Sequence, residues 1–149
     1  MIDRYTLPEM GTIWTEHAKF QSWLDVELAA CEANLKLGKI PGNAMKEIRE
    51  KAEFSPERIL QIESEVRHDV IAFLTNLNEN IGDSGRFIHV GMTSSDVLDT
   101  GLALQLKASV KLLIKEIKNL QHIIREKACE HKTTVMIGRS HAIHGLSLI

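Results

Sequence analysis

Apolar side chains recur at helical spacing along most of the chain, and short polar breaks separate the stripes they form. In the first stripe they step by three or four positions and so share one helix face: Phe20, Leu24, Leu28, Cys31 and Leu35. Gly38, with Pro41 shortly after it, predicts the end of this helix. A short helix is then predicted from Asn43 to Ala52, because that segment is charged and rich in Ala, Met and Ile.

A further stripe begins after a clear helix-start signal, in which Ser55 is the N-cap and Pro56 the first-turn proline. Its apolar members keep the same three/four step: Ile59, Ile62, Val66, Val70, Leu74, Leu77 and Ile81. The consecutive polar residues Arg67-His68-Asp69 interrupt the stripe and predict a break or a turn. The glycine-containing segment 82–85 predicts a loop.

The longest stripe has a seven-residue repeat. Its positions alternate steps of four and three: Leu102, Leu106, Val110, Leu113, Ile117, Leu120 and Ile124. Such a repeat favours packing in a left-handed helical bundle. A helix from Ser94 to His131 is longer than a domain of this size needs. We therefore expect its surplus apolar seam to pack against other segments or subunits, or else the helix to kink and fold back. After His131 the pattern indicates an extended segment or a loop, and the fold class predicted overall is all-α.

Composition narrows the possible partners. Of the 149 residues 44% are hydrophobic, which is enough to form a core. The 18 basic and 20 acidic residues form no basic block, and aromatics are only 5%, so a nucleic-acid partner is disfavoured. Cys31 and Cys129 lie in apolar helical stretches, which predicts reduced, buried thiols. Without a membrane-spanning run or a signal-peptide pattern, we expect a cytoplasmic protein with no membrane partner.

The start of the longest predicted helix carries an excess of hydroxyl groups. Thr93, Ser94 and Ser95 follow a glycine and precede Asp96. One helix needs one N-cap side chain. The extra hydroxyls are therefore either redundant caps or, with the free backbone N–H groups and the helix dipole, a site for a carboxylate or phosphate.

Two other polar clusters leave similar alternatives open. Arg67-His68-Asp69 is either a solvated helix end or a binding group, with the arginine for an anion, the imidazole for hydrogen bonding and the carboxylate as acceptor. His141 and His144 are either solvent-facing or include a general acid or base, with Gly138-Arg139 as a turn and anion partner. Zinc is disfavoured, because zinc sites need three or four protein ligands and no cysteine pair is nearby.

Taken in order, several segments resemble the adenylosuccinate lyase family of the fumarase/aspartase superfamily. They are IDRYTLPEM, IWTEHAKFQSWLDVELAACEA, RHDVIAFL, HVGMTSSDVLDT and EHKTTVMIGRSHAIHG. The ordered set covers the chain to Gly145 and separates it from relatives that act on argininosuccinate, aspartate or malate. The resemblance implies a β-elimination that converts adenylosuccinate into AMP and fumarate. It also implies the same cleavage of the succinylated aminoimidazole carboxamide ribotide of purine biosynthesis, in a homotetramer that needs no metal or organic cofactor.

The resemblance assigns roles at the nucleotide end of the substrate. Arg4 and Tyr5 would contact the nucleotide phosphate. Arg67, His68 and Asp69 would line the nucleotide and phosphate pocket.

It also assigns roles at the succinyl end. Thr93 and Ser94 would hold a carboxylate of the succinyl group, with His89 close by. His141 would be the general acid that protonates the departing nitrogen. Ser140 stands where the family usually has threonine and keeps the hydroxyl.

The chain departs from the family after residue 145. Leu146-Ser147-Leu148-Ile149 replaces a Glu-Pro followed by a Thr/Phe/Gly stretch, and the serine loop that supplies the family's base is not among these residues. By resemblance the chain corresponds to the first third of the enzyme, with an N-terminal helical domain at 1–92 and a truncated start of the central helical-bundle domain at 93–149. We expect it not to turn over adenylosuccinate alone. A non-catalytic module for self-association or nucleotide binding, and another fumarate-releasing lyase, are the alternatives.

Overall fold

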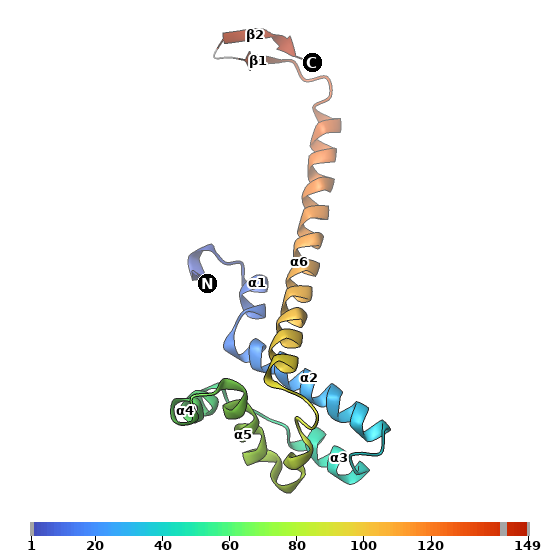
Figure 1. Ribbon diagram of the computed structural model, residues 1–149. Coiled ribbons are helices and arrows are strands. Elements are labelled where there is room, and N and C mark those ends of the chain that lie inside the picture. The colour runs from blue at the N-terminus through green and yellow to red at the C-terminus, as the bar shows by residue number, and fades with distance from the viewer. Residues whose placement is uncertain (1, 141–142, 149) are drawn as a thin grey trace. The chain divides into compact units, whose positions relative to one another are not determined.

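The computed structural model describes residues 2–140 and 143–148, and it divides into two compact units, Met1–Ser109 and Val110–Ile149. In chain order, the first unit contains η1 (Asp3–Tyr5), α1 (Pro8–Ile13), α2 (Glu16–Lys36), α3 (Gly42–Lys51), α4 (Pro56–Val66), α5 (Asp69–Ile81), the 3-10 helix η2 (Gly82–Phe87) and the start of α6 (Ser94–Glu130) (Figure 1). The predicted helical fold class is confirmed. In the second unit, the segment predicted to be extended or a loop forms the antiparallel hairpin β1 (Met136–Ser140) and β2 (Ile143–Leu148).

Local chemistry sets the helix boundaries that the sequence predicted. Helix α2 ends at Lys36, just before Gly38, whose φ of 71° suits a residue without a Cβ. Ser55 caps α4, since its hydroxyl accepts the Arg58 N–H at 3.3 Å. The predicted break lies at Arg67, between α4 and α5. The predicted loop at 82–85 instead forms the first residues of η2.

An aromatic cluster forms the centre of the core. The fully buried ring of Phe73 on α5 stacks on that of Phe20 on α2, with 5.9 Å between ring centroids and 8° between ring planes. Its centroid is also 5.5 Å from that of Trp23 and 6.3 Å from that of Phe54. Helices α2, α4 and α5 thus pack their predicted apolar faces together around these rings, and α3 adds Ala44, Met45 and Ile48 to the same core.

A glycine allows α6 to approach α2 closely. A Cβ at Gly101 would lie 2.7 Å from Cδ1 of Trp23 and 3.0 Å from Oγ of Ser22. The start of α6 is further held to the end of α1, because the Gln105 side-chain amide donates to the Ile13 carbonyl at 2.7 Å. The amino-terminal part of α6, to Ser109, therefore belongs to the core of the first unit.

The apolar seam of α6, which the repeat predicted would pack against other segments or subunits, is exposed in the chain. The exposed members are Leu102, Leu106, Val110, Leu113, Ile117, Leu120 and Ile124. Cys129 was predicted to be buried and is exposed, because this face of α6 is not covered, whereas Cys31 is buried as predicted. Within the described residues, no helix is both long and apolar enough to cross a membrane.

Replacing Phe73 by alanine tests the aromatic core. The change removes a fully buried ring that contacts three others, so Phe73→Ala should lower the free energy of unfolding by about 3–5 kcal/mol. Ile71→Ala is the matched control on the same helix, because Ile71 is exposed, and it should cost less than about 1 kcal/mol. Urea unfolding followed by circular dichroism measures both. Equal losses would contradict this description of the core.

Candidate functional site

A carboxylate, and not a hydroxyl, caps the start of α6. Asp96 accepts the backbone N–H of Thr93 at 2.8 Å, while its own N–H donates to the Thr93 carbonyl at 3.0 Å. This is one arm of a capping box. The hydroxyls of Thr93, Ser94 and Ser95, and the N–H groups of the two serines, make no hydrogen bond to any described residue. The extra hydroxyls are thus not used as caps here.

The loop before α6 is held by a buried glutamate. Glu27, on α2, has 0% exposed side-chain surface. Its Oε2 accepts the backbone N–H of His89 at 2.9 Å, and its Oε1 lies 2.6 Å from Nδ1 of the same residue. Because a carboxylate can only accept, Nδ1 of His89 carries a proton. The His89 side chain keeps 21% of its surface exposed.

Other side chains on the same face of α2 hold the same loop. The Cys31 thiol lies 3.7 Å from the carbonyl oxygen of Phe87, and the Asn34 amide donates to the Val90 carbonyl at 3.4 Å. Burial, with a smaller contribution from the nearby Glu27 carboxylate, raises the pKa of the Cys31 thiol from 9.0 to about 11. Helix α2 therefore fixes the loop at several successive points.

The polar break between α4 and α5 forms a second candidate group. His68 is the N-cap of α5, and its Nδ1 accepts the Ile71 N–H at 3.4 Å. The Asp69 carboxylate accepts the Val70 N–H at 2.7 Å. Arg67 lines an open pocket of about 600 Å³ on α4. The capping contacts fit a solvated helix end, and the Arg67 side chain beside them is exposed.

The loop before α6 and the α4–α5 break each contain a residue with left-handed backbone conformation. Among the described residues, Arg67 and His89 are the non-glycine residues with positive φ, at 52° and 64°. This conformation costs about 1–3 kcal/mol and often occurs at functional sites. Both residues were candidates from the sequence; at Arg67 this conformation is the C-cap that ends α4, whereas His89 lies in the loop before α6.

The remaining candidates lie apart from these groups in the chain. Arg4 and Tyr5 are in η1, where the Arg4 guanidinium lies 4.8 Å from the centroid of the exposed Tyr5 ring. Ser140 ends β1 in the second unit, where its backbone pairs with Ile143. His141 lies outside the described residues. Within the described part, no hydrogen bond or ion pair joins η1, the α4–α5 break and the α6 start to one another.

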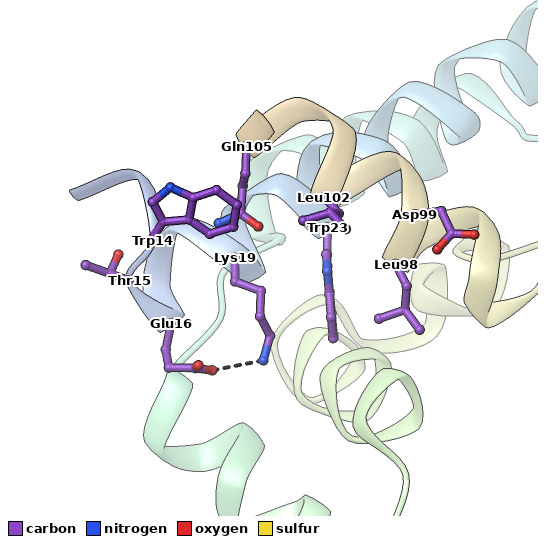
Figure 2. Close-up of a pocket in the computed structure, with 9 residues that line it drawn as sticks. All are labelled: Trp14, Thr15, Glu16, Lys19, Trp23, Leu98, Asp99, Leu102 and Gln105. Carbon is purple, nitrogen blue, oxygen red and sulfur yellow. Dashed lines mark hydrogen bonds and ion pairs between the residues drawn. The ribbon is translucent and has the colours of Figure 1, made fainter. Parts of the chain in front are cut away.

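A pocket of about 390 Å³ lies beside the start of α6 but contains none of the predicted site residues. Figure 2 shows its lining residues, which are Trp14, Thr15, Glu16, Lys19, Trp23, Leu98, Asp99, Leu102 and Gln105. An ion pair of 3.0 Å joins Lys19 to Glu16 at this pocket. Among the described residues, no three His, Cys, Asp or Glu side chains are grouped to hold a metal ion.

Sequence reasoning missed Glu27. Its signal was present, because Glu27 lies between Leu24 and Cys31 on the apolar face of the first predicted helix. An acidic residue on a buried stripe needs a buried partner. The periodicity did not indicate which residue that partner would be.

Substitutions at the α6 start test which side chain caps the helix and which hydroxyls do not. Asp96→Ala should lower the free energy of unfolding by about 1 kcal/mol, because it leaves the Thr93 N–H without its acceptor. Ser94→Ala and Ser95→Ala should each change it by less than about 0.5 kcal/mol. Urea denaturation measures all three, and a serine variant as costly as Asp96→Ala would show that the hydroxyl is a cap.

The two cysteines should differ sharply in reactivity. The thiolate is the reactive form, and Cys31 is buried with a pKa of about 11. A disulfide reagent at pH 8 should therefore label Cys129 quickly and Cys31 only on unfolding. In Cys129→Ser, fast labelling of the folded chain would contradict this.

The raised pKa of Cys31 also makes the free energy of unfolding depend on pH. Since the pKa in the folded chain lies above the ordinary value of 9.0, the thiol of the unfolded chain ionises first, and the contribution of Cys31 to the free energy of unfolding is lost as pH rises from 9 to 11.

Comparison with curated proteins identifies close relatives. The adenylosuccinate lyase of Synechocystis sp. is 62% identical over 144 residues, and that of Bacillus subtilis is 49% identical over 144 residues. Each alignment covers 97% of this chain and 33% of the relative. The chain thus spans about a third of the length of the relatives it matches, and the resemblance predicted from its motifs is confirmed.

Solved structures agree on the fold. The fumarate lyase from Mesorhizobium sp. BNC1 matches with a TM-score of 0.83 at 27% identity, over 93% of this chain and 34% of that one. The 3-carboxy-cis,cis-muconate lactonizing enzyme from Pseudomonas putida matches with a TM-score of 0.87 at 27% identity, over 99% and 36%. A general model of the lyase family matches residues 3–147, and this chain belongs to that lyase family.

Proposed function

We propose that this chain is the N-terminal, substrate-binding part of an adenylosuccinate lyase of purine biosynthesis. The reaction is the elimination of fumarate from adenylosuccinate to leave AMP, and from the related succinylated carboxamide ribotide. The 62% identity to an adenylosuccinate lyase over nearly the whole chain supports this substrate class. The proposal includes a cytoplasmic homotetramer, for which the exposed α6 seam offers an apolar surface.

The start of α6 is the observation that carries the proposal. Its cap is supplied by Asp96, so the hydroxyls of Thr93 and Ser94 and the serine N–H groups are available to a ligand. These are hydrogen-bond donors at the positive end of a 37-residue helix, which suits a carboxylate. We assign them to a carboxylate of the succinyl group.

The chemistry of the elimination fits these donors. Removal of a proton next to a carboxylate places negative charge on that carboxylate, as an aci-carboxylate, and fixed donors stabilise charge where it develops. His141 is assigned to protonate the departing nitrogen, for which an imidazole with a pKa near neutrality is suited. Arg4, Tyr5 and the Arg67–Asp69 break are assigned to the nucleotide and its phosphate. No residue of this chain is assigned to remove the proton.

A chimera tests the proposal. Residues 1–145 would replace the matching third of the Synechocystis relative, and fumarate release from adenylosuccinate would be followed by absorbance. We expect the chimera to be active and His141→Ala to reduce kcat about 100- to 10,000-fold. Ser94→Ala should reduce kcat/KM about tenfold or more, whereas Ser95→Ala, the neighbouring hydroxyl, should change it little. The 149 residues alone should release no fumarate.

Two outcomes would contradict the proposal. One is a chimera that folds as a homotetramer but does not release fumarate. The other is turnover that His141→Ala leaves intact. A chimera that binds other fumarate-yielding compounds better than adenylosuccinate would favour another lyase of the superfamily.

The exposed seam favours one alternative, a helical module that associates without catalysis. Its apolar side chains lie on one face of α6 at a seven-residue repeat. Sedimentation of the purified chain distinguishes the two, since a discrete small oligomer that does not bind adenylosuccinate would favour the module.

A further inference from the structure

We infer that Glu27 is a positioning residue that sets the imidazole of His89 for the substrate, an inference that rests on the proposed function. Both hydrogen bonds of the buried Glu27 carboxylate to described residues go to His89, one from its backbone N–H and one from its ring. A buried carboxylate is costly unless it is fully paired. His89 alone provides that pairing here, and the resemblance places His89 near the succinyl group.

The contact fixes which ring nitrogen is available. Nδ1 faces Glu27 and carries a proton, as the 2.6 Å contact to a carboxylate oxygen requires. Nε2 has no partner among the described residues, and within that part of the chain no buried side-chain nitrogen or oxygen lacks a partner. Nε2 is therefore open to solvent and is the atom available to a ligand.

The same glutamate fixes the backbone beneath the ring. His89 has a φ of 64°, which is unfavourable for a residue with a Cβ. The His89 N–H donates a hydrogen bond of 2.9 Å to Oε2 of Glu27, and this bond stabilises the left-handed conformation. Hydrogen bonds from α2 to residues 87 and 90 brace the loop on either side. Ring orientation and backbone conformation are thus set together.

A tight turn joins His89 to the proposed carboxylate site. The Met92 N–H donates to the His89 carbonyl at 3.3 Å, and Gly91 has a φ of 79°. Thr93 follows directly. Glu27 thereby acts on the substrate through His89 without touching it: it keeps the proton on Nδ1 and leaves Nε2 free, in the turn that leads into the α6 start.

Nitrogen-15 NMR of the full 149-residue chain tests the tautomer directly. In the neutral ring of wild-type His89, Nδ1 should be protonated and Nε2 should not. In Glu27→Gln the amide oxygen must stay with the His89 N–H, which leaves its NH2 facing the ring. The tautomer should then reverse, with the proton on Nε2. Wild-type His89 protonated at Nε2 alone would overturn the inference, whether or not any variant folds.

Kinetics of the chimera tests the consequence for the substrate. Glu27→Gln should raise KM for adenylosuccinate about tenfold, with kcat changed by less than about threefold. Glu32→Gln is the matched control, because Glu32 is an exposed glutamate on the same helix that pairs with Arg49 at 2.8 Å, and KM should not change. In a His89→Ala background, Glu27→Gln should add no further effect. A merely structural role would instead lower the yield of folded enzyme and leave KM unchanged, which would overturn the inference.

The two readouts separate this inference from the proposed function. A chimera that releases no fumarate would contradict the function, while the NMR spectrum of the chain would still report how Glu27 sets His89. An active chimera with an unchanged KM in Glu27→Gln would contradict the positioning role alone.

Discussion

A buried carboxylate on α2 ties the loop before α6 to the core. Removing a charged carboxylate from water costs several kcal/mol, and Glu27 offsets that cost with two hydrogen bonds to one residue. Those bonds also hold His89 in a left-handed conformation that the backbone alone disfavours. Each partner is therefore unfavourable without the other, and the pair fixes where the chain enters α6.

Two histidines in the candidate groups use Nδ1 in opposite ways. His68 accepts a backbone N–H at Nδ1, so its neutral ring carries the proton on Nε2. His89 donates from Nδ1 to Glu27, so its neutral ring leaves Nε2 unprotonated. The neutral ring of His68 thus offers a donor, whereas Nε2 of His89 accepts when the ring is neutral and donates to an anion only when the ring is charged. Helix capping sets one of these states and a buried acid sets the other, so the two imidazoles are not interchangeable.

Periodicity predicted those parts of the fold that depend on local sequence. The apolar stripes, Gly38, the Ser55–Pro56 cap and the polar break at Arg67 gave the boundaries of α2, α4 and α5, because each signal lies within a turn of the boundary it marks. The sequence did not predict the short helix α1 or the pairing of the hairpin. The prediction that Cys129 is buried was wrong. An apolar stripe shows that a helix face favours burial, but it does not show whether another segment covers that face.

The candidate site was less predictable, because its key contact is long-range. Glu27 and His89 are 62 positions apart, and no local pattern connects them. The residues that the sequence did identify at the α6 start are adjacent in the chain, as are those at the α4–α5 break. The Thr93 backbone at the proposed carboxylate site, and His89 before it, are held by hydrogen bonds within residues 1–109. The proposed function thus places the donors for the succinyl carboxylate within the first unit. The proposed mechanism assigns proton donation to His141, which lies outside the described residues.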